Sequence, residues 1–140
     1  MNIPYRIDKI ETRQFAIFPD KLVTGQNIDV STNFNFAVSS DTSHIRCIAS
    51  IRYEQQENLI MVLEIACHFG LSPDGIEQIT SQGKIDVEFL RYIATIAVGT
   101  ARGIIHAQTQ GTPVNAIVLP PINLIPTITE DMPLVKQDKC

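Results

Sequence analysis

The order of the sequence patterns predicts an α+β fold: a four-stranded antiparallel sheet, a long C-terminal helix packed on one face of it, and an extended Pro-rich segment after the helix. Three observations support this prediction. Residues 26–39 alternate between apolar and polar side chains, which is typical of a strand with one buried face. Residues 44–55 and 59–72 repeat the alternation on either side of a short turn. Residues 88–105 instead carry apolar side chains at helical spacing.

The first segment, residues 5–18, is the least regular of the four predicted strands. Its odd positions are apolar at both ends, but Lys9, Glu11 and Arg13 interrupt that face in the middle, and Ile10 and Phe18 lie on the other face. An extended strand with a bulge near its middle, at an edge of the sheet, accounts for this mixture.

The third and fourth strands are predicted to form a hairpin whose register the sequence specifies. A tight turn centred near residues 56–58 pairs residues whose numbers have a constant sum of 114. A slip by one residue would place charged side chains on the apolar face, so one register is strongly favoured. The expected pairs are Ile51 with Leu63, Ala49 with Ile65, Cys47 with Cys67, and Ile45 with Phe69.

The long helix is predicted to begin near Asp86, a suitable N-cap residue, and to end before Gly111. Glu88 is favourable in the first turn because the helix N-terminus attracts negative charge. Residues 76–86 before it are expected to form a polar connection with room for a short helical turn. Arg102, among apolar neighbours, is expected to pair with a carboxylate or with backbone carbonyls.

Gly99 and Gly103 lie four residues apart in this helix. Each glycine costs a helix about 0.5–1 kcal/mol relative to alanine, so two of them indicate a packing reason. One interpretation is close packing on the domain's own sheet. The interpretation that we favour is close approach of a symmetry-related helix in an oligomer with two-fold symmetry.

Length and charge restrict the class of protein. We expect residues 1–126 to form a single domain and residues 127–140 a flexible C-terminal tail. The net charge is −4 and the chain has no basic run, which argues against nucleic-acid binding. No signal peptide is visible, and the longest apolar stretch is too short and too polar for membrane insertion. Three cysteines, an odd number, do not form a disulfide framework, which favours a reducing compartment. A cytoplasmic protein is therefore expected.

The sequence contains no convincing catalytic, metal or cofactor site. Cys47 and Cys67 could form a metal site with His44 and His68, but both histidines are at even positions and point to the opposite face, so two buried thiols are the better interpretation. His106 fits a helix C-terminus better than a catalytic role, since no nucleophile lies at informative spacing. The glycines form no phosphate loop. We expect no enzyme and no cofactor; a small enzyme would require converging polar groups in a concave site.

The C-terminal half of the chain resembles the SecB family of protein-export chaperones. The resemblance is carried by Ala101-Arg102, the break Gly111-Thr112-Pro113, and the sequence Leu119-Pro120-Pro121-Ile122-Asn123-Leu124. Four long strands precede the helix in the same order as in that family, and Val62-Leu63-Glu64 occupies the place of a similar apolar-apolar-Glu run.

This resemblance implies a homotetramer, assembled as a dimer of dimers, that holds unfolded polypeptides in apolar grooves without ATP, in protein export or translocation. The SecA translocation motor is a second implied partner, and a module or chaperone dedicated to one partner such as an antitoxin is the alternative function. The expected site residues, from the residue patterns and the resemblance together, fall into three groups: for polypeptide binding Ile48, Ile60, Val62, Leu119, Ile122 and Leu124; for motor docking Asp8, Glu11 and Glu64; and for the helix contact Gly99 and Gly103.

Overall fold

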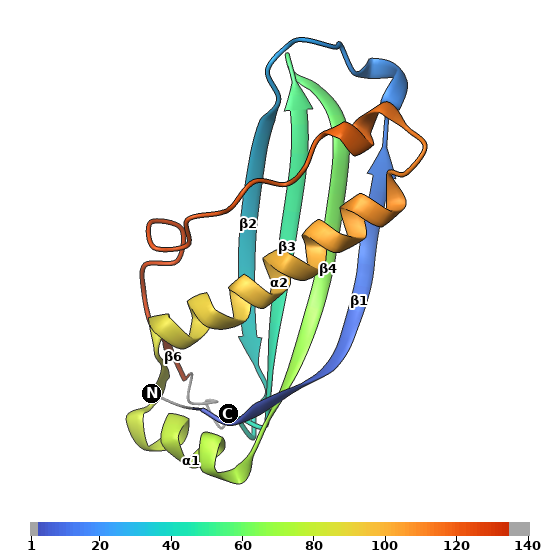
Figure 1. The fold of residues 1–140 in the computed structure, drawn as a ribbon. Coiled ribbons are helices and arrows are strands. Elements are labelled where there is room, and N and C mark those ends of the chain that lie inside the picture. The colour runs from blue at the N-terminus through green and yellow to red at the C-terminus, as the bar shows by residue number, and fades with distance from the viewer. Residues whose placement is uncertain (1–2, 135–140) are drawn as a thin grey trace, which may run out of the picture.

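The computed structural model describes residues 3–134 and has the predicted α+β architecture, with one long helix crossing one face of a four-stranded antiparallel sheet (Figure 1). Within these residues, no helix is both long enough and apolar enough to cross a lipid bilayer. The elements, in chain order, are β1 (Tyr5–Ile17), η1 (Pro19–Lys21), β2 (Asp29–Val38), β3 (His44–Gln55), β4 (Asn58–Leu71), α1 (Pro73–Gln82), β5 (Lys84–Ile85), α2 (Val87–Gln108), η2 (Pro113–Ala116) and β6 (Met132–Pro133).

The sheet has the strand order β1-β4-β3-β2, so the predicted β3–β4 hairpin lies at its centre. The predicted register is confirmed, with Cys47 opposite Cys67 and all the other expected pairs in place. Gln56 and Glu57 form the turn with φ of 50° and 69°, the left-handed region that a tight hairpin turn requires. The residues of β3 and β4 that share a face with Cys47 are buried beneath α2. We call this the inner face and the opposite one the outer face.

Strand β1 lies at an edge of the sheet and is bulged, as predicted. The pairing with β4 shifts twice, between Ile7 and Lys9 and between Thr12 and Gln14. The other edge strand, β2, pairs with β3 over ten consecutive residues without any shift. The two edges therefore differ: bulges and charged side chains disrupt the free edge of β1, whereas β2 is regular and contains no Lys, Arg or Pro.

The connection between the sheet and the long helix is more ordered than predicted. Instead of a polar connection with one helical turn, it contains the ten-residue helix α1 and the short strand β5. The Ser72 hydroxyl caps α1 by accepting a hydrogen bond from the Gly75 amide, and Gly83 ends the helix with φ of 71°. Ile79 anchors α1 in the core.

Helix α2 begins after Asp86, whose carboxylate accepts a hydrogen bond from the Glu88 amide, so the predicted N-cap is confirmed. The helix crosses the sheet diagonally in Figure 1. Its buried stripe packs on the inner face and includes Leu90, Ile93, Ala97 and Ala101. Most of the apolar stripe predicted for this helix therefore lies in the hydrophobic core.

The segment after α2 runs back along the inner face towards the start of the helix (Figure 1). Two arginines three turns apart on α2 bind its carbonyls: Arg102 donates to Leu119 and Pro120 at 2.8 and 3.0 Å, and Arg91 donates to Ile128 and Ile125 at 2.9 and 3.1 Å. Of the two partners predicted for Arg102, a carboxylate or backbone carbonyls, the structure shows the backbone carbonyls.

The boundary expected at residues 126/127 does not coincide with a change in packing. Ile128 is buried, β6 pairs with β5, and the Asp131 carboxylate accepts hydrogen bonds from the Lys84 ammonium and the Val87 amide. The Lys84 ammonium and that amide together hold the pKa of Asp131 below its usual value. The rest of the expected tail, residues 135–140, lies outside the described residues.

Candidate functional site

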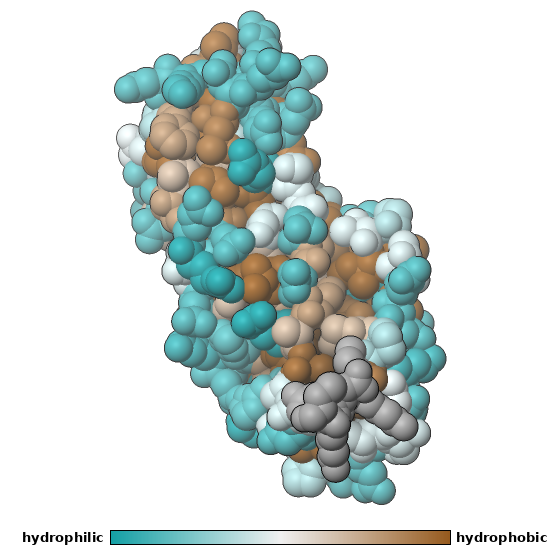
Figure 2. Space-filling model, turned by 180° about the vertical axis from the view of Figure 1, so that it is seen from behind, coloured by the Kyte–Doolittle hydropathy of each residue, from teal (hydrophilic) through white to brown (hydrophobic). Residues whose placement is uncertain are grey.

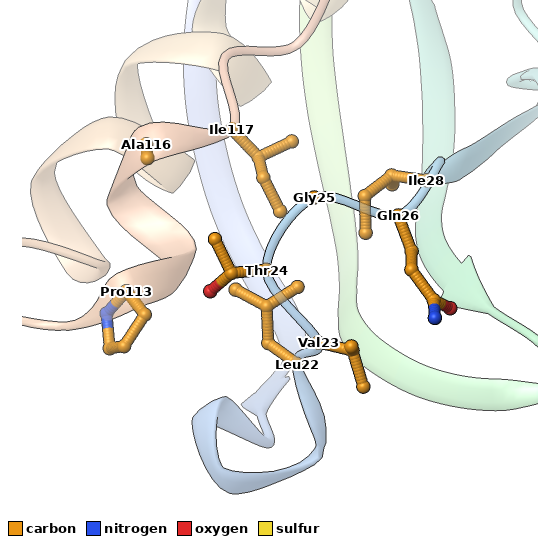
Figure 3. A pocket seen from close by; sticks show the side chains of 9 residues that line it. All are labelled: Leu22, Val23, Thr24, Gly25, Gln26, Ile28, Pro113, Ala116 and Ile117. Carbon is orange, nitrogen blue, oxygen red and sulfur yellow. The ribbon is translucent and has the colours of Figure 1, made fainter.

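An apolar hollow lies where the loop between β1 and β2 meets η2 (Figure 3). Its volume is about 350 Å³, which is within the range of sites that accept a side chain or a small molecule. Figure 3 shows the side chains of Leu22, Ile28 and Ile117 converging from the loop and from the start of the C-terminal segment. The lining is completed by Val23, Thr24, Gly25, Gln26, Pro113 and Ala116.

The loop that forms one wall of the hollow is held by a buried amide at the end of β3. The Gln55 side chain accepts a hydrogen bond from the Val23 amide at 2.7 Å and donates to the carbonyls of Val23 and Gln26 at 2.8 and 3.3 Å. These bonds fix the backbone while the Val23 side chain stays 47% exposed. An apolar side chain is thereby presented to solvent on a rigid support.

The opposite wall is fixed to the end of α2. The Asn115 side chain donates to the His106 carbonyl at 2.9 Å and to the Thr109 hydroxyl at 3.1 Å, and the Thr112 hydroxyl donates to the Thr109 carbonyl. Val114 is buried beneath this turn. The break Gly111-Thr112-Pro113 that the sequence singled out therefore positions one side of the hollow.

Further apolar side chains are exposed along the C-terminal segment. Val118 and Ile125 are both 66% exposed, although Leu119 and Leu124 beside them are buried. A second hollow of about 350 Å³ lies between β2 and this segment, where Phe34, Phe36 and Leu90 provide apolar surface. Apolar surface is thus available on both sides of the C-terminal segment.

The residues predicted for polypeptide binding are not brought together. Leu119, Ile122 and Leu124 belong to the C-terminal segment, where Leu119 and Leu124 are buried and Ile122 is half-buried. Ile48 and Val62 lie on the outer face, and Ile48 is half-buried there. Ile60 is completely buried in the core, because a register shift after Tyr53 changes the pairing of β4 at this point. Ile60 therefore supports the sheet.

The residues predicted for motor docking lie on the outer face, and each carboxylate has a basic partner. Asp8 pairs with Arg6 at 2.6 Å, and Glu64 pairs with Arg13 at 3.5 Å. Glu11 is 2.6 Å from His68 and 3.4 Å from Lys9, and both partners lower its pKa. The negative charge of these side chains is locally compensated.

Gly99 and Gly103 lie on the exposed stripe of α2. A Cβ atom placed on either residue would meet no atom within 4 Å outside the helix backbone. The domain's own sheet therefore gives no reason for these two glycines, and the predicted contact with another helix remains a prediction.

Cys47 and Cys67 are free and buried on the inner face, opposite each other. Burial, with a smaller effect of Cys67, raises the pKa of Cys47 to about 12, and burial also raises that of Cys67. His44 and His68 pair with carboxylates on the outer face, and residues 3–134 contain no cluster of side chains suited to holding a metal ion.

A Cys140→Ser variant, which retains only these two thiols, is expected to react with a thiol reagent at pH 8 at least about a hundredfold more slowly when native than when unfolded. The raised pKa keeps both folded thiols protonated at pH 8. The contribution of Cys47 burial to the free energy of unfolding is fully present below pH 9 and declines as the pH rises towards 12. Reaction rates followed by absorbance with and without denaturant provide the measurement; equal rates would contradict the buried placement.

The loop residues of the hollow were not among the sequence-predicted sites. The only signal for them is the apolar pair Leu22-Val23 within a segment that otherwise reads as a turn. Their meeting with Pro113 and Ile117 depends on chain segments about 90 residues apart, which no local pattern encodes.

No family model matches the chain, and a search of curated proteins found no match. Among solved structures, the chain is similar to the Mycobacterium tuberculosis Rv1957 SecB-like chaperone in complex with a ChAD peptide from the Rv1956 HigA1 antitoxin. The two share 16% sequence identity; the match covers 84% of this chain and 90% of that chain, with a TM-score of 0.46.

Proposed function

We propose that this chain is an ATP-independent molecular chaperone that holds unfolded polypeptides, as the resemblance to the SecB family implies. The observation that carries the proposal is the apolar hollow between the β1–β2 loop and η2, with exposed Val23 at its edge. Apolar surface rimmed by polar residues is the usual mark of a polypeptide-binding site. The surface needs no nucleotide to form, because the hydrogen bonds of Gln55 and Asn115 already fix both of its walls.

An extended client segment would place apolar side chains in the hollow and on the exposed side chains of the C-terminal segment. A hollow of about 350 Å³ accepts one large side chain at a time, so clients rich in spaced aromatic and aliphatic residues are favoured. The net charge of −4 suits clients with basic residues between the apolar ones.

The proposed assembly is a homotetramer in which the α2 helices meet at Gly99 and Gly103. The support is that both glycines face open space within the chain and that α2 exposes Tyr92 on the same stripe. Small residues at this spacing let two helices approach closely.

A chaperone dedicated to one partner is the second candidate function. Basic side chains lie next to the carboxylates of Asp8, Glu11 and Glu64. These carboxylates therefore offer little uncompensated negative charge to a motor protein, which favours a dedicated chaperone over docking on SecA. An antitoxin is one such partner; the Rv1957 SecB-like chaperone is known in complex with a ChAD peptide from the HigA1 antitoxin.

The proposed function predicts that the purified protein suppresses aggregation of a chemically denatured client without ATP. Light scattering after dilution of the client from denaturant should fall as the protein approaches one tetramer per client, and added ATP should change nothing. Undiminished scattering at a stoichiometric amount would contradict general holding. Suppression for a single partner only would support the dedicated chaperone instead.

A further inference from the structure

The free edge of β2 is regular and open to solvent. Residues 29–38 pair with β3 without a bulge, and none of the ten is buried. Within residues 3–134, no backbone hydrogen bond joins β2 to any segment except β3. In Figure 1 the C-terminal segment crosses in front of β2 and then descends beside it, without pairing with it. The backbone groups on this side of β2 therefore have no partner strand in the described chain.

The register of β2 on β3 shows which backbone groups point to the free edge. The Ser39 amide donates to the His44 carbonyl at 2.9 Å beside the turn, so these two residues form a hydrogen-bonded pair. Hydrogen-bonded and non-hydrogen-bonded pairs alternate along an antiparallel ladder, and this ladder has no register shift. The odd-numbered residues of β2 therefore direct their backbone groups to β3. The even-numbered residues direct their N–H and C=O groups to the free edge and their side chains to the inner face; they are Val30, Thr32, Phe34, Phe36 and Val38.

The opposite edge of the sheet is protected in a way that β2 is not. Strand β1 is interrupted by two register shifts and carries Lys9, Glu11 and Arg13. Bulges, charged side chains and prolines are the usual devices that prevent an edge strand from pairing with another chain. Strand β2 has no bulge and no proline, and from Val30 to Val38 it has no charged residue. The absence of these three devices indicates that the edge of β2 is available for pairing.

The two sides of this edge specify the side chains that fit on a paired strand. On the inner side, the second hollow lies between Phe34, Phe36 and the segment 127–133, and its volume of about 350 Å³ accepts one large side chain. Figure 2 shows the molecule from the outer face, where hydrophilic residues surround smaller apolar areas. A strand in which apolar and uncharged polar residues alternate matches both sides. The outer-face residues of β2 within this stretch are small and uncharged: Ser31, Asn33, Asn35 and Ala37.

A second copy of this chain fits the edge less well than a single strand does. Pairing of β2 with its own copy would follow a two-fold axis perpendicular to the sheet, so both inner faces would lie on the same side. Each copy would then bring its residues 127–133 to the shared edge. The hollow has room for a side chain but not for a second backbone segment. A single extended strand avoids this conflict, because it brings no segment across the inner face.

We propose that β2 binds an extended segment of an unfolded polypeptide as a fifth, antiparallel strand of the sheet. The apolar residues of that segment face the second hollow, and its uncharged polar residues extend the outer face. Backbone hydrogen bonds supply affinity for any strand, and the hollow selects among side chains. The proposal rests on the proposed holding function for the class of its ligand. The site is nevertheless a separate one, since no residue of β2 lines the hollow of Figure 3.

The test uses a fluorescein-labelled peptide of alternating Val and Thr, with Lys at both ends for solubility, and fluorescence anisotropy as the readout. Wild type should bind the unmodified peptide. In the proposed pairing the Val residues lie opposite the even-numbered residues of β2, so their N–H groups point to β2 and those of the Thr residues point away. N-methylation of the Val residues should weaken binding at least about tenfold, because it removes the donors to β2. N-methylation of the same number of Thr residues should change the affinity less than about threefold, because those groups face solvent.

Thr32→Pro is the matching variant of the protein. It removes one N–H group from the free edge, and proline is tolerated in edge strands where the N–H faces solvent. Thr32→Ala keeps that N–H group and serves as the control. Thr32→Pro should weaken binding of the unmodified peptide at least about fivefold, and Thr32→Ala less than about twofold. Circular dichroism verifies that both variants are folded, and the comparison of the two N-methylated peptides on wild type decides the proposal without either variant.

Four outcomes would overturn the proposal. They are no binding of the unmodified peptide, equal losses for the two N-methylated peptides, full affinity in folded Thr32→Pro, and a lower mass of that variant in analytical ultracentrifugation. The second would mean that side chains alone hold the peptide, and the fourth that a second copy of the chain occupies the edge. A Val23→Asp variant, which alters only the hollow of Figure 3, should bind the peptide like wild type, so failure of the proposed holding function and failure of this site are distinguishable.

Discussion

A Val23→Asp variant is expected to bind an unfolded client about tenfold more weakly than wild type. Val23 lines the hollow and its side chain is 47% exposed, so a client that covers it removes apolar surface from water. Covering the exposed half of a valine is worth about 1 kcal/mol, and desolvating a carboxylate in its place adds a penalty. Together they correspond to about 1.4 kcal/mol, or a factor of ten in the dissociation constant. Fluorescence anisotropy with a reduced and alkylated, permanently unfolded protein measures this constant.

The matched control for this variant is Ile10→Asp. Ile10 is also 47% exposed but lies on β1, outside the lining of the hollow. Both substitutions are at exposed positions, and the backbone bonds of Val23 to Gln55 persist, so both variants should unfold within about 0.5 kcal/mol of wild type. Equal weakening of client binding by the two variants would mean that exposed apolar surface in general, and not the hollow, holds the client.

A Gly103→Leu variant is expected to lower the oligomeric state while leaving the fold of the chain intact. No atom of the chain obstructs a side chain at this position, and leucine favours the helix by about 1 kcal/mol over glycine. Two helices that meet at Gly103 would nevertheless be forced apart by the new side chain. Analytical ultracentrifugation should show a lower mass than that of the proposed tetramer, with an unchanged or higher melting temperature.

Gly103→Ala serves as the control because it gives most of the same gain in helix propensity with one methyl group. It should keep the assembly, and Gly99→Leu should repeat the effect of Gly103→Leu one turn away. An unchanged mass for both leucine variants would show that the helix contact is wrongly placed. Loss of assembly in the alanine variant as well would indicate a contact even closer than proposed.

The sequence was informative where a repeating pattern and a turn together restrict the structure. The alternation in β3 and β4 fixed the hairpin register to the residue, including Cys47 opposite Cys67, because a slip would bury charge. The interrupted pattern of β1 correctly indicated a bulged edge strand. Asp86 correctly indicated the start of α2, since a side-chain cap is a local feature.

Features that depend on distant contacts were missed. The hollow exists because Gln55 holds a loop about 30 residues before it in the chain and because η2 returns to meet that loop. Neither contact produces a periodic pattern of apolar residues in the sequence. Strict alternation along β4 predicts that Ile60 lies on a binding surface. The register shift after Tyr53 breaks this alternation, and Ile60 is buried in the core. Helix α1 is longer than the single helical turn predicted there. Its sequence is mostly polar, and Ile76 and Ile79 are its only large apolar residues at helical spacing.

The way in which the C-terminal segment is attached determines how far its exposed apolar side chains can move. From Val118 to Thr127, within the described chain, no amide donates to a backbone carbonyl, and the attachments are the side chains of Arg91 and Arg102 and a few apolar anchors. The sheet beneath is held by a continuous ladder of backbone bonds. The free energy needed to detach a segment locally is smaller when fewer hydrogen bonds and buried contacts hold it. The C-terminal segment can therefore move away from the sheet on a faster timescale than the strands can separate. The exposed Val118 and Ile125 can therefore shift to follow a bound chain, while the two walls of the hollow and the core stay in place.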